Sequence, residues 1–189
     1  MAERRRGAAL ESALLDAAWE ELLDVGYAGF TLDGVASRAG TSRPVIHRRW
    51  PDKRQLMVAA LARTAERHPV AVPDTGSLRG DVLELLRHIN ATRAHFVTAI
   101  SIQLAAYFEE TGTTPADLRT LIHPGRRPAI EVLFDRAAGR GEIDPDRITA
   151  RMKSLPFDLL RHELLTTSTP VPDAVLEEIV DTLFLPLVL

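Results

Sequence analysis

Basic side chains cluster within one short segment, at Arg43, His47, Arg48 and Arg49. A guanidinium group can bind phosphate oxygens or pair with guanine through two hydrogen bonds, and an imidazole N–H can donate to phosphate. In a helix, Arg43 and His47 would share a face because they are four residues apart, while Ile46 and Trp50 would share another. The segment therefore predicts a short helix over residues 42–49 with an apolar back and a basic front.

The charge of the whole chain hides this cluster. The 189 residues carry a formal net charge of −3, which argues against a polyanionic partner. Residues 31–54, however, contain six Lys or Arg and only two acidic residues, a local charge of +4. Residues 55–189 contain fourteen basic and eighteen acidic residues. A basic patch thus lies on an otherwise acidic chain.

A second short helix is predicted immediately before the basic one. Thr31 is a good N-cap, and Asp33 suits the positive end of the helix dipole in the first turn. Gly40 follows where the helix must end, at a position that favours positive φ. A small apolar face is supplied by Val35, Ala36 and Ala39.

The turn leads into the basic helix with suitable chemistry. Thr41 or Ser42 can cap that helix, and Pro44 is tolerated in a first turn, which needs no intrahelical N–H. Two short helices around a glycine turn are the parts of a helix-turn-helix, whose second helix enters the DNA major groove. Residues 4–6, all Arg, could add a basic arm. The alternative is an amphipathic helix pair with a solvated basic face.

The stretch from Phe30 to Leu56 resembles the DNA-binding domain of the tetracycline-repressor family of bacterial transcription regulators. The preceding segment 8–30 resembles the first helix of that family. Weaker similarity to one type of family C-terminal domain lies in the Arg-Gly-Glu-Ile stretch at 140–143 and in residues 156–161. The positions that match the family's N-terminal pattern are Thr31, Val35, Ala36, Ala39, Gly40, Ser42, Trp50, Lys53 and Leu56.

Three positions depart from the family pattern. His47 stands where Tyr is usual, Trp50 where Phe is usual, and Thr41 where Val is commoner. The operator sequence therefore cannot be transferred. The resemblance implies a repressor that a small molecule releases from a pseudo-palindromic operator in double-stranded DNA. The predicted DNA contacts are Thr31, Thr41, Ser42, Arg43, Pro44, Val45, His47, Arg48, Arg49 and Lys53.

The rest of the chain also predicts helices. Turn-forming residues break it at 68–77, 111–115, 123–128, 139–145 and 166–173. Between these breaks, apolar residues recur with helical spacing, and strands are hard to find. We expect an all-α chain of about nine helices, with a kink or short break at Pro156. Residues 1–55 are predicted to form a three-helix DNA-binding domain, and residues 56–189 a helical bundle for ligand sensing and dimerisation.

A two-fold dimer is expected to be built on residues 145–165 together with the carboxyl-terminal segment, residues 173–187. This segment is too apolar to face water, and one subunit has little remaining core to cover it. Intramolecular burial is the alternative. The predicted interface residues are Met152, Leu159, Leu176, Ile179, Val180, Leu183, Phe184 and Leu187.

A small-molecule pocket is expected among the helices of residues 78–165. Aromatic residues gather there beside a few polar groups, as is usual for such sites. We expect a mainly apolar effector of unknown identity with one or two hydrogen-bonding groups. The predicted lining residues are Phe96, Ile100, Gln103, Tyr107, Phe134, Phe157 and Arg161.

Other classes of site find little support in the sequence. The absence of cysteine excludes disulfides, a cysteine nucleophile and Cys-ligated metals. Asp81, Glu84, His88 and His95 fall near one helical face, but metal sites in bundles usually need several helices, so we expect solvated charges and a partly buried histidine there. We expect no metal, cofactor, catalytic residue or membrane partner, and a cytoplasmic protein. A helical bundle that binds a small molecule, or an enzyme, without a DNA role remains the alternative function.

Overall fold

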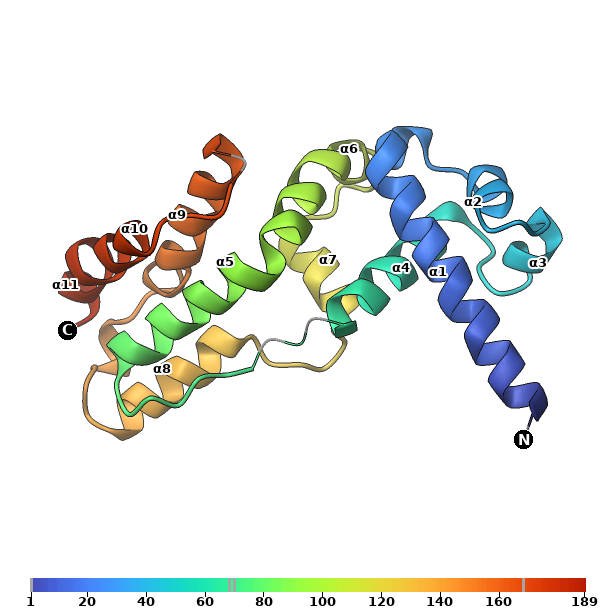
Figure 1. Cartoon of the computed structure of the whole chain (residues 1–189). Coiled ribbons are helices and arrows are strands. Elements are labelled where there is room, and N and C mark those ends of the chain that lie inside the picture. Colours follow the sequence, from blue (N-terminus) through green and yellow to red (C-terminus); the bar gives the residue numbers. More distant parts are fainter. Residues whose placement is uncertain (1, 68, 70, 168) are drawn as a thin grey trace. The chain divides into compact units, whose positions relative to one another are not determined.

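The computed structural model describes residues 2–67, 69, 71–167 and 169–189, apart from the side chains at 2–6, 93 and 95–100. In this part of the chain, eleven α-helices and no strands occur, which confirms the all-α prediction (Figure 1). The α-helices are α1 (Ala2–Gly29), α2 (Leu32–Arg38), α3 (Arg43–His47), α4 (Lys53–Arg67), α5 (Leu78–Gln103), α6 (Ala105–Thr111), α7 (Pro115–Ile122), α8 (Ala129–Gly139), α9 (Ala150–Thr167), α10 (Asp173–Glu178) and α11 (Leu185–Val188).

Two interruptions raise the number of helices above the predicted nine. Leu104 separates α5 from α6, although no turn-forming residue precedes it. A π-helical segment, η2 (Ile179–Phe184), separates α10 from α11. Each of the five predicted breaks separates two successive helices, although its first or last residues can belong to them, and a 3-10 turn, η1 (Pro145–Arg147), has Asp144 as its N-cap.

The predicted break at Pro156 is wrong. Helix α9 runs through this residue without interruption, and Pro156 is buried. Proline lacks the backbone N–H that would donate one helical hydrogen bond, but α9 remains helical at this residue. Packing of the buried Pro156 therefore outweighs the cost of the missing hydrogen bond.

The chain forms two compact units, each described here by itself. Unit 1 comprises Met1–Pro69 and Ala99–Arg126, and unit 2 comprises Val70–Thr98 and Arg127–Leu189. These units do not follow the expected boundary at residue 55, because α4, α6 and α7 pack with the N-terminal helices. Helix α5 contributes residues to both units.

Unit 1 has a core between α1 and α4 (Figure 1). Leu14, Ala18 and Leu22 of α1 are buried as their four-residue spacing predicts, whereas Leu10 is 40% exposed. Gly26 interrupts the helical backbone of α1 with φ +62°. A Cβ atom there would lie 2.9 Å from the Gln103 Oε1 atom, so both conformation and space favour glycine.

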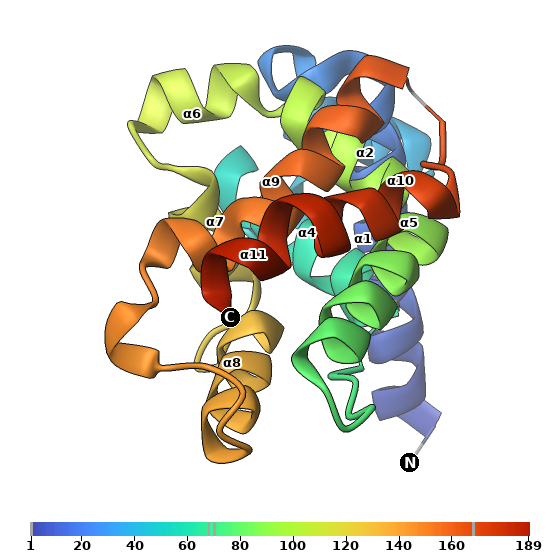
Figure 2. The ribbon, with the colours of Figure 1, turned by 90° about the vertical axis from the view of Figure 1, so that its left-hand side faces the viewer.

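Unit 2 has a core formed by α5, α8, α9 and the carboxyl-terminal helix, which comprises α10, η2 and α11. Segment η2 packs against α9, and the carboxyl-terminal helix lies in front of α9 in Figure 2. The Phe134 and Phe184 rings meet edge to face with centroids 6.0 Å apart. This contact joins α8 to η2 inside the unit.

The buried carboxyl-terminal side chains correct the reasoning behind the expected dimer interface. Leu176, Ile179, Val180 and Phe184 are covered by their own unit, so the assumption that one subunit lacked core for them is wrong. Met152 and Leu159 pack partly against the same core. Of the eight expected interface residues, those that remain exposed are Leu183, at 44%, and Leu187, at 51%.

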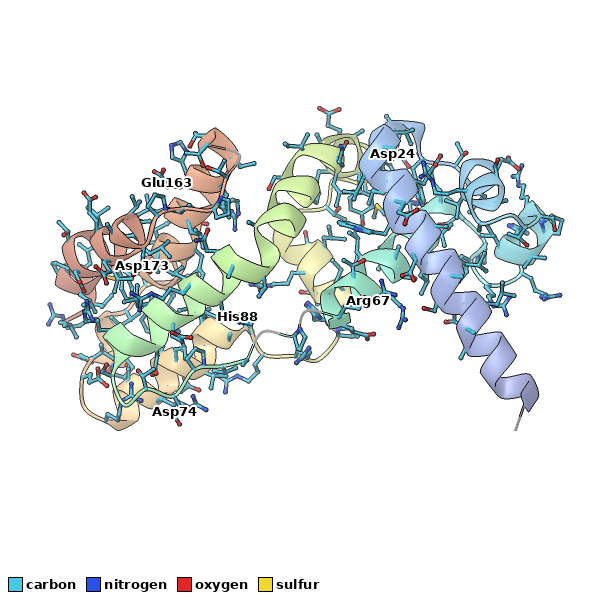
Figure 3. All side chains as sticks on the ribbon, viewed as in Figure 1. Asp24, Arg67, Asp74, His88, Glu163 and Asp173 are labelled. Atoms are coloured by element: carbon cyan, nitrogen blue, oxygen red, sulfur yellow. The ribbon has the colours of Figure 1, made fainter. Side chains whose placement is uncertain are left out.

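Ion pairs attach α5 to the carboxyl-terminal helix in unit 2. Arg79 donates to both Asp181 oxygens at 2.6 and 2.7 Å, and Arg87 donates to both Asp173 oxygens at 2.6 and 2.5 Å. Asp173 lies at the start of α10 in Figure 3. The arginine hydrogen bonds lower the pKa of Asp173 and of Asp181. Charge in unit 2 thus stabilises the packing of its own helices.

Asp81 was expected to be a solvated charge, and this expectation is wrong. Its side chain is fully buried, and its Oδ1 accepts hydrogen bonds from the Thr75 N–H at 2.6 Å and the Thr75 hydroxyl at 2.8 Å. Arg140 Nη2 donates to the other oxygen at 3.2 Å. Glu142 accepts from the Leu78 N–H at 2.7 Å, which satisfies a free donor at the start of α5. The stretch at 140–143 therefore anchors the segment that precedes α5.

Candidate nucleic-acid interface

Helix α2 begins as its sequence predicts. The Gly34 N–H donates to the Thr31 hydroxyl at 3.0 Å, and Thr31 has extended backbone angles, as an N-cap requires. Val35 and Ala36 are buried and Ala39 is partly buried, so the small apolar face packs inward. These contacts confirm the predicted first helix of the pair.

The turn and α3 also follow the prediction, with one exception. Gly40 has φ +61°, and the Thr41 N–H donates to the Ala36 carbonyl at 2.9 Å, which closes α2. Ser42 occupies the N-cap of α3 but makes no side-chain capping hydrogen bond, so this part of the expectation is wrong. Pro44 lies in the first turn. Helix α3 itself ends at His47 and not at the expected residue 49.

Ile46 and Trp50 anchor the back of the basic segment. Ile46 is fully buried and Trp50 is 9% exposed, so both side chains fix α3 against unit 1. On the other side, Arg43, His47 and Arg48 are exposed. The predicted division into an apolar back and a basic front is therefore present.

Several positive charges near α3 are already paired. Arg38 donates to Glu21 at 2.9 Å and also binds Asp24, and these hydrogen bonds raise its pKa. Arg43 Nη1 lies 3.1 Å from Asp33 Oδ2, an ion pair between the starts of α3 and α2. The local charge of +4 therefore overstates the charge that remains for an external partner.

Arg49 differs from the other basic residues of the segment. Its side chain is partly buried, and its Nη1 atom is buried without a hydrogen-bond partner among the described residues. This orientation does not fit the predicted base contact. The outward-facing set is thus reduced to Arg43, His47 and Arg48, with Ser42 and Pro44 also exposed and Thr41 and Val45 partly buried.

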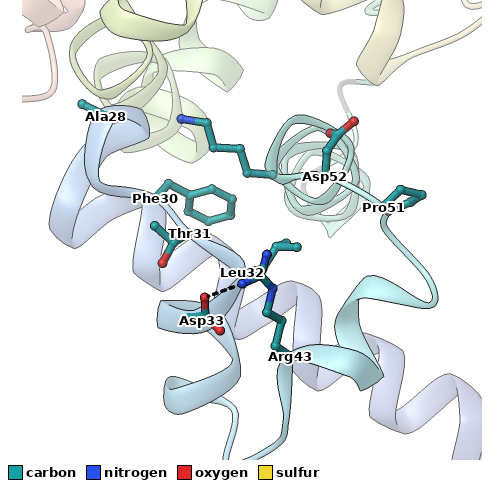
Figure 4. Close-up of a pocket in the computed structure, with 9 residues that line it drawn as sticks. Ala28, Phe30, Thr31, Leu32, Asp33, Arg43, Pro51 and Asp52 are labelled. Carbon is teal, nitrogen blue, oxygen red and sulfur yellow. Dashed lines mark hydrogen bonds and ion pairs between the residues drawn. The ribbon is translucent and has the colours of Figure 1, made fainter.

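An open hollow of about 420 Å³ lies beside the helix pair (Figure 4). Thr31, Asp33 and Arg43 line it, and the dashed line in Figure 4 marks the Arg43–Asp33 ion pair. Asp52 also lines it and accepts a hydrogen bond from the Gln55 N–H at 2.8 Å. The further lining residues are Ala28, Phe30, Leu32, Pro51 and Lys53. The lining of the hollow thus combines the Thr31 hydroxyl group with two basic and two acidic side chains.

The Lys53 ammonium group contacts Tyr27 and Glu110 within unit 1. Its Nζ atom lies 3.5 Å from the Tyr27 carbonyl oxygen, 3.6 Å from Glu110 Oε2 and 4.0 Å from the centre of the Tyr27 ring. The Tyr27 hydroxyl donates to Glu110 Oε1 at 3.1 Å. Burial and the hydrogen bond to Glu110 raise the pKa of Tyr27, so the phenol is neutral and acts as a donor.

Sequence reasoning missed Tyr27 and Glu110 as neighbours of Lys53. The only signal for Tyr27 was its place in the glycine-rich end of α1. Glu110 lies 57 residues after Lys53 and next to an equally acidic Glu109, so nothing in the sequence distinguishes it. Only the packing of α6 on α1 brings these groups together.

The predicted pocket residues do not gather in one unit. Gln103 donates to the Leu23 carbonyl oxygen at 2.9 Å, and Tyr107 packs edge to face on Tyr27 with centroids 5.2 Å apart, both within unit 1. The others whose side chains are described belong to unit 2, namely Phe134, Phe157 and Arg161. Phe96 and Ile100 lie outside the described side chains, as does His95.

The described residues contain neither a metal-binding cluster nor a membrane-spanning helix. Among the described residues, no group of three or more His, Asp or Glu side chains is placed to hold a metal ion. Within the same residues, no helix combines the length and the apolarity needed to cross a bilayer.

Comparisons with known proteins match both ends of the chain. Residues 14–60 match the model for bacterial regulatory proteins of the tetR family, and residues 72–183 match the tetracyclin repressor-like C-terminal domain. A DNA-binding transcriptional repressor TetR of Mycobacteroides abscessus is 32% identical over 184 residues, which is 97% of this chain and 96% of the relative.

Another relative and a solved structure extend this similarity. An HTH-type transcriptional regulator of Mycobacterium bovis is 31% identical over 180 residues, which is 93% of this chain and 86% of the relative. The crystal structure of the TetR family transcription regulator SCO0332 is 28% identical, with a TM-score of 0.59, and covers 93% of this chain and 96% of that one.

Proposed function

Because the chain belongs to the tetracycline-repressor family of bacterial transcription regulators, we propose that α3 enters the major groove of operator DNA and presents Arg43 and Arg48 there. The chain is a DNA-binding transcriptional repressor. The exposed basic face of α3 is the observation that carries the assignment of these residues. Arginine at such a position can read guanine or bind phosphate.

The residues around α3 have a positioning role in this proposal. Thr31 and the exposed polar groups beside the hollow lie where they can meet the DNA backbone, and such contacts set the register of a protein on the duplex. His47 replaces the tyrosine usual in the family and can donate a ring N–H to phosphate. We leave Arg49 out of the recognition surface because its Nη1 atom faces inward.

The test begins with selection of a duplex from a random-sequence DNA library by the wild-type protein. Mobility shift with the selected duplex is then repeated with Arg43→Ala and Arg48→Ala together. Loss of specific binding is expected, with the variant still folded by circular dichroism. Unchanged affinity at fixed salt would overturn the assignment, and failure to select any duplex would favour a small-molecule-binding bundle or an enzyme.

We further propose that two copies bind together to a two-fold operator. Leu183 and Leu187 are exposed on the carboxyl-terminal helix, and Met152 and Leu159 of α9 are only partly buried, which leaves apolar surface for a second copy. A two-fold dimer would offer two recognition helices to a pseudo-palindromic site. Leu183→Asp should give monomers by light scattering and weaken DNA binding. A variant that remains dimeric would contradict this interface.

The remaining part of the proposal is release by a small, mainly apolar effector that binds among helices of residues 78–165. Its binding must favour a conformation with lower DNA affinity, since equal affinity for both conformations would change nothing. Native mass spectrometry of freshly purified protein can detect a retained molecule. Tyr107→Phe then tests the hydroxyl without removing the ring that packs on Tyr27. An unchanged response of this variant would exclude the Tyr107 hydroxyl.

A further inference from the structure

Lys53 has two kinds of neighbour within unit 1. The residue lines the hollow beside the helix pair, together with Thr31 and Arg43. Its Nζ atom, however, lies against the Tyr27 carbonyl oxygen and Glu110, at 3.5 and 3.6 Å. A lysine side chain is flexible and carries a compact charge, so a small rotation can redirect this ammonium group.

Glu110 is held in position for this contact. The Tyr27 hydroxyl donates to its Oε1 atom at 3.1 Å, while its Oε2 atom faces Lys53. Tyr27 is 1% exposed and packs on the Tyr107 ring, so the donor is fixed by the core of unit 1. The neighbouring Glu109 is exposed on the same helix, and no ion pair is recorded for it among the described residues.

A phosphate that approaches Lys53 would meet the same charge that Glu110 now neutralises. The carboxylate would also repel the phosphate at short range, since two like charges near one ammonium group oppose each other. This competition would lower the affinity for every DNA whose backbone contacts Lys53, whatever its base sequence.

We propose that Glu110 is an intramolecular competitor for Lys53: the ammonium group must leave this carboxylate to reach the DNA backbone, and this requirement lowers the affinity of the protein for DNA. This inference rests on the proposed function, because it requires Lys53 to contact phosphate in the complex. It adds a residue of α6, outside the helix-turn-helix, to those that set DNA affinity.

The test compares two neighbouring carboxylates. Glu110→Gln keeps the side-chain shape and removes the charge, while Glu109→Gln makes the same change of net charge one residue away. Binding of the selected duplex is measured by fluorescence anisotropy over a range of salt concentrations. We expect Glu110→Gln to bind up to about fivefold more tightly, the range of exposed ion pairs, and Glu109→Gln to change binding by less than about twofold.

The salt dependence and a double variant identify Lys53 as the group that is released. The slope of log affinity against log salt should be nearly the same in Glu110→Gln and in the wild type, because Lys53 reaches the same phosphate in both. Lys53→Gln should weaken binding and reduce the slope. In the Lys53→Gln background, Glu110→Gln should have no further effect, because the group it competes for is absent.

Three outcomes would overturn the inference while the proposed function stands. They are equal effects of Glu110→Gln and Glu109→Gln, an effect of Glu110→Gln that persists without Lys53, and a Lys53→Gln protein that binds the selected duplex like the wild type. Thermal unfolding of each variant separates altered binding from misfolding. Tyr27→Phe removes the hydrogen bond to Glu110 and is a second way to loosen this carboxylate. A wild-type protein that selects no duplex would overturn both proposals.

Discussion

Arg48 of unit 1 differs from several arginines of unit 2 in its partners. In unit 2, Arg79, Arg87 and Arg127 each bind a carboxylate of the same unit. In unit 1, Arg48 at the end of α3 is exposed, and no ion pair engages it among the described residues. The difference shows that the number of arginines does not locate an external site. What matters is which guanidinium groups the fold leaves without an internal carboxylate.

The carboxyl-terminal helix and α3 differ in a second way. Both carry a run of side chains that the sequence predicted to face a partner. In α3 the basic side chains do face outward, while four of the apolar ones in the carboxyl-terminal helix fill the core of unit 2. Charged groups are rarely buried unpaired, so their exposure is predictable, whereas an apolar face can be covered by either its own chain or another.

The largest expected effect tests whether Phe184 belongs to the core. Its ring is fully buried against Phe134, so Phe184→Ala should lower the free energy of unfolding by about 3–5 kcal/mol. Urea unfolding measures this, with Leu189→Ala as the control because Leu189 is 68% exposed. Equal losses in both variants would contradict the intramolecular core.

Substitution of Arg48 tests whether this exposed arginine of unit 1 contributes to DNA binding. Arg48→Ala should weaken binding of the selected duplex by about 1–3 kcal/mol if the guanidinium group reads a base. Arg127→Ala removes the same group from unit 2, where it pairs with Asp135, and should leave DNA binding within about twofold. Fluorescence anisotropy at one fixed salt concentration is the measurement. If Arg127→Ala weakened binding as much, the contrast between the units would fail.

The N-cap residues of α2 and α3, Thr31 and Ser42, should differ in their contribution to stability. Thr31→Ala removes a hydrogen bond to the Gly34 N–H and should destabilise unit 1 by about 1 kcal/mol. Ser42→Ala should cost clearly less, because the Ser42 side chain makes no capping hydrogen bond. Thermal unfolding without DNA compares them. The cap assignment is wrong if Ser42→Ala proves the more harmful change.

The smallest expected effect concerns acid. Arginine hydrogen bonds lower the folded-state pKa of Asp173 and Asp181 below the ordinary value of 3.8. Their contribution to stability is therefore fully present above about pH 4 and is lost as the pH falls through the lower folded-state values. Urea unfolding between pH 5 and 3 should show the wild type converging on the Asp173→Asn, Asp181→Asn variant. A difference independent of pH would contradict these pairs. The exposed position of both groups keeps the effect small.

Much of unit 1 could be predicted because its determinants are local. Thr31, Gly40 and Pro44 act within a few residues of themselves, through a cap, a positive φ and a fixed φ. The break at Leu104 escaped prediction because no glycine or proline marks it. Pro156 misled the prediction because tertiary packing keeps α9 helical despite the missing donor.

The helical class, the helix-turn-helix pair and the basic front of α3 could be predicted from the residues alone, since each depends on spacing within one or two helical turns. Tertiary packing was needed to show that Phe184 is internal, that Asp81 is buried and pairs with Arg140, and that Lys53 faces Glu110. Burial and ion pairing depend on segments far apart in the chain. Their approach is set by packing of whole helices, which the residue types alone do not specify.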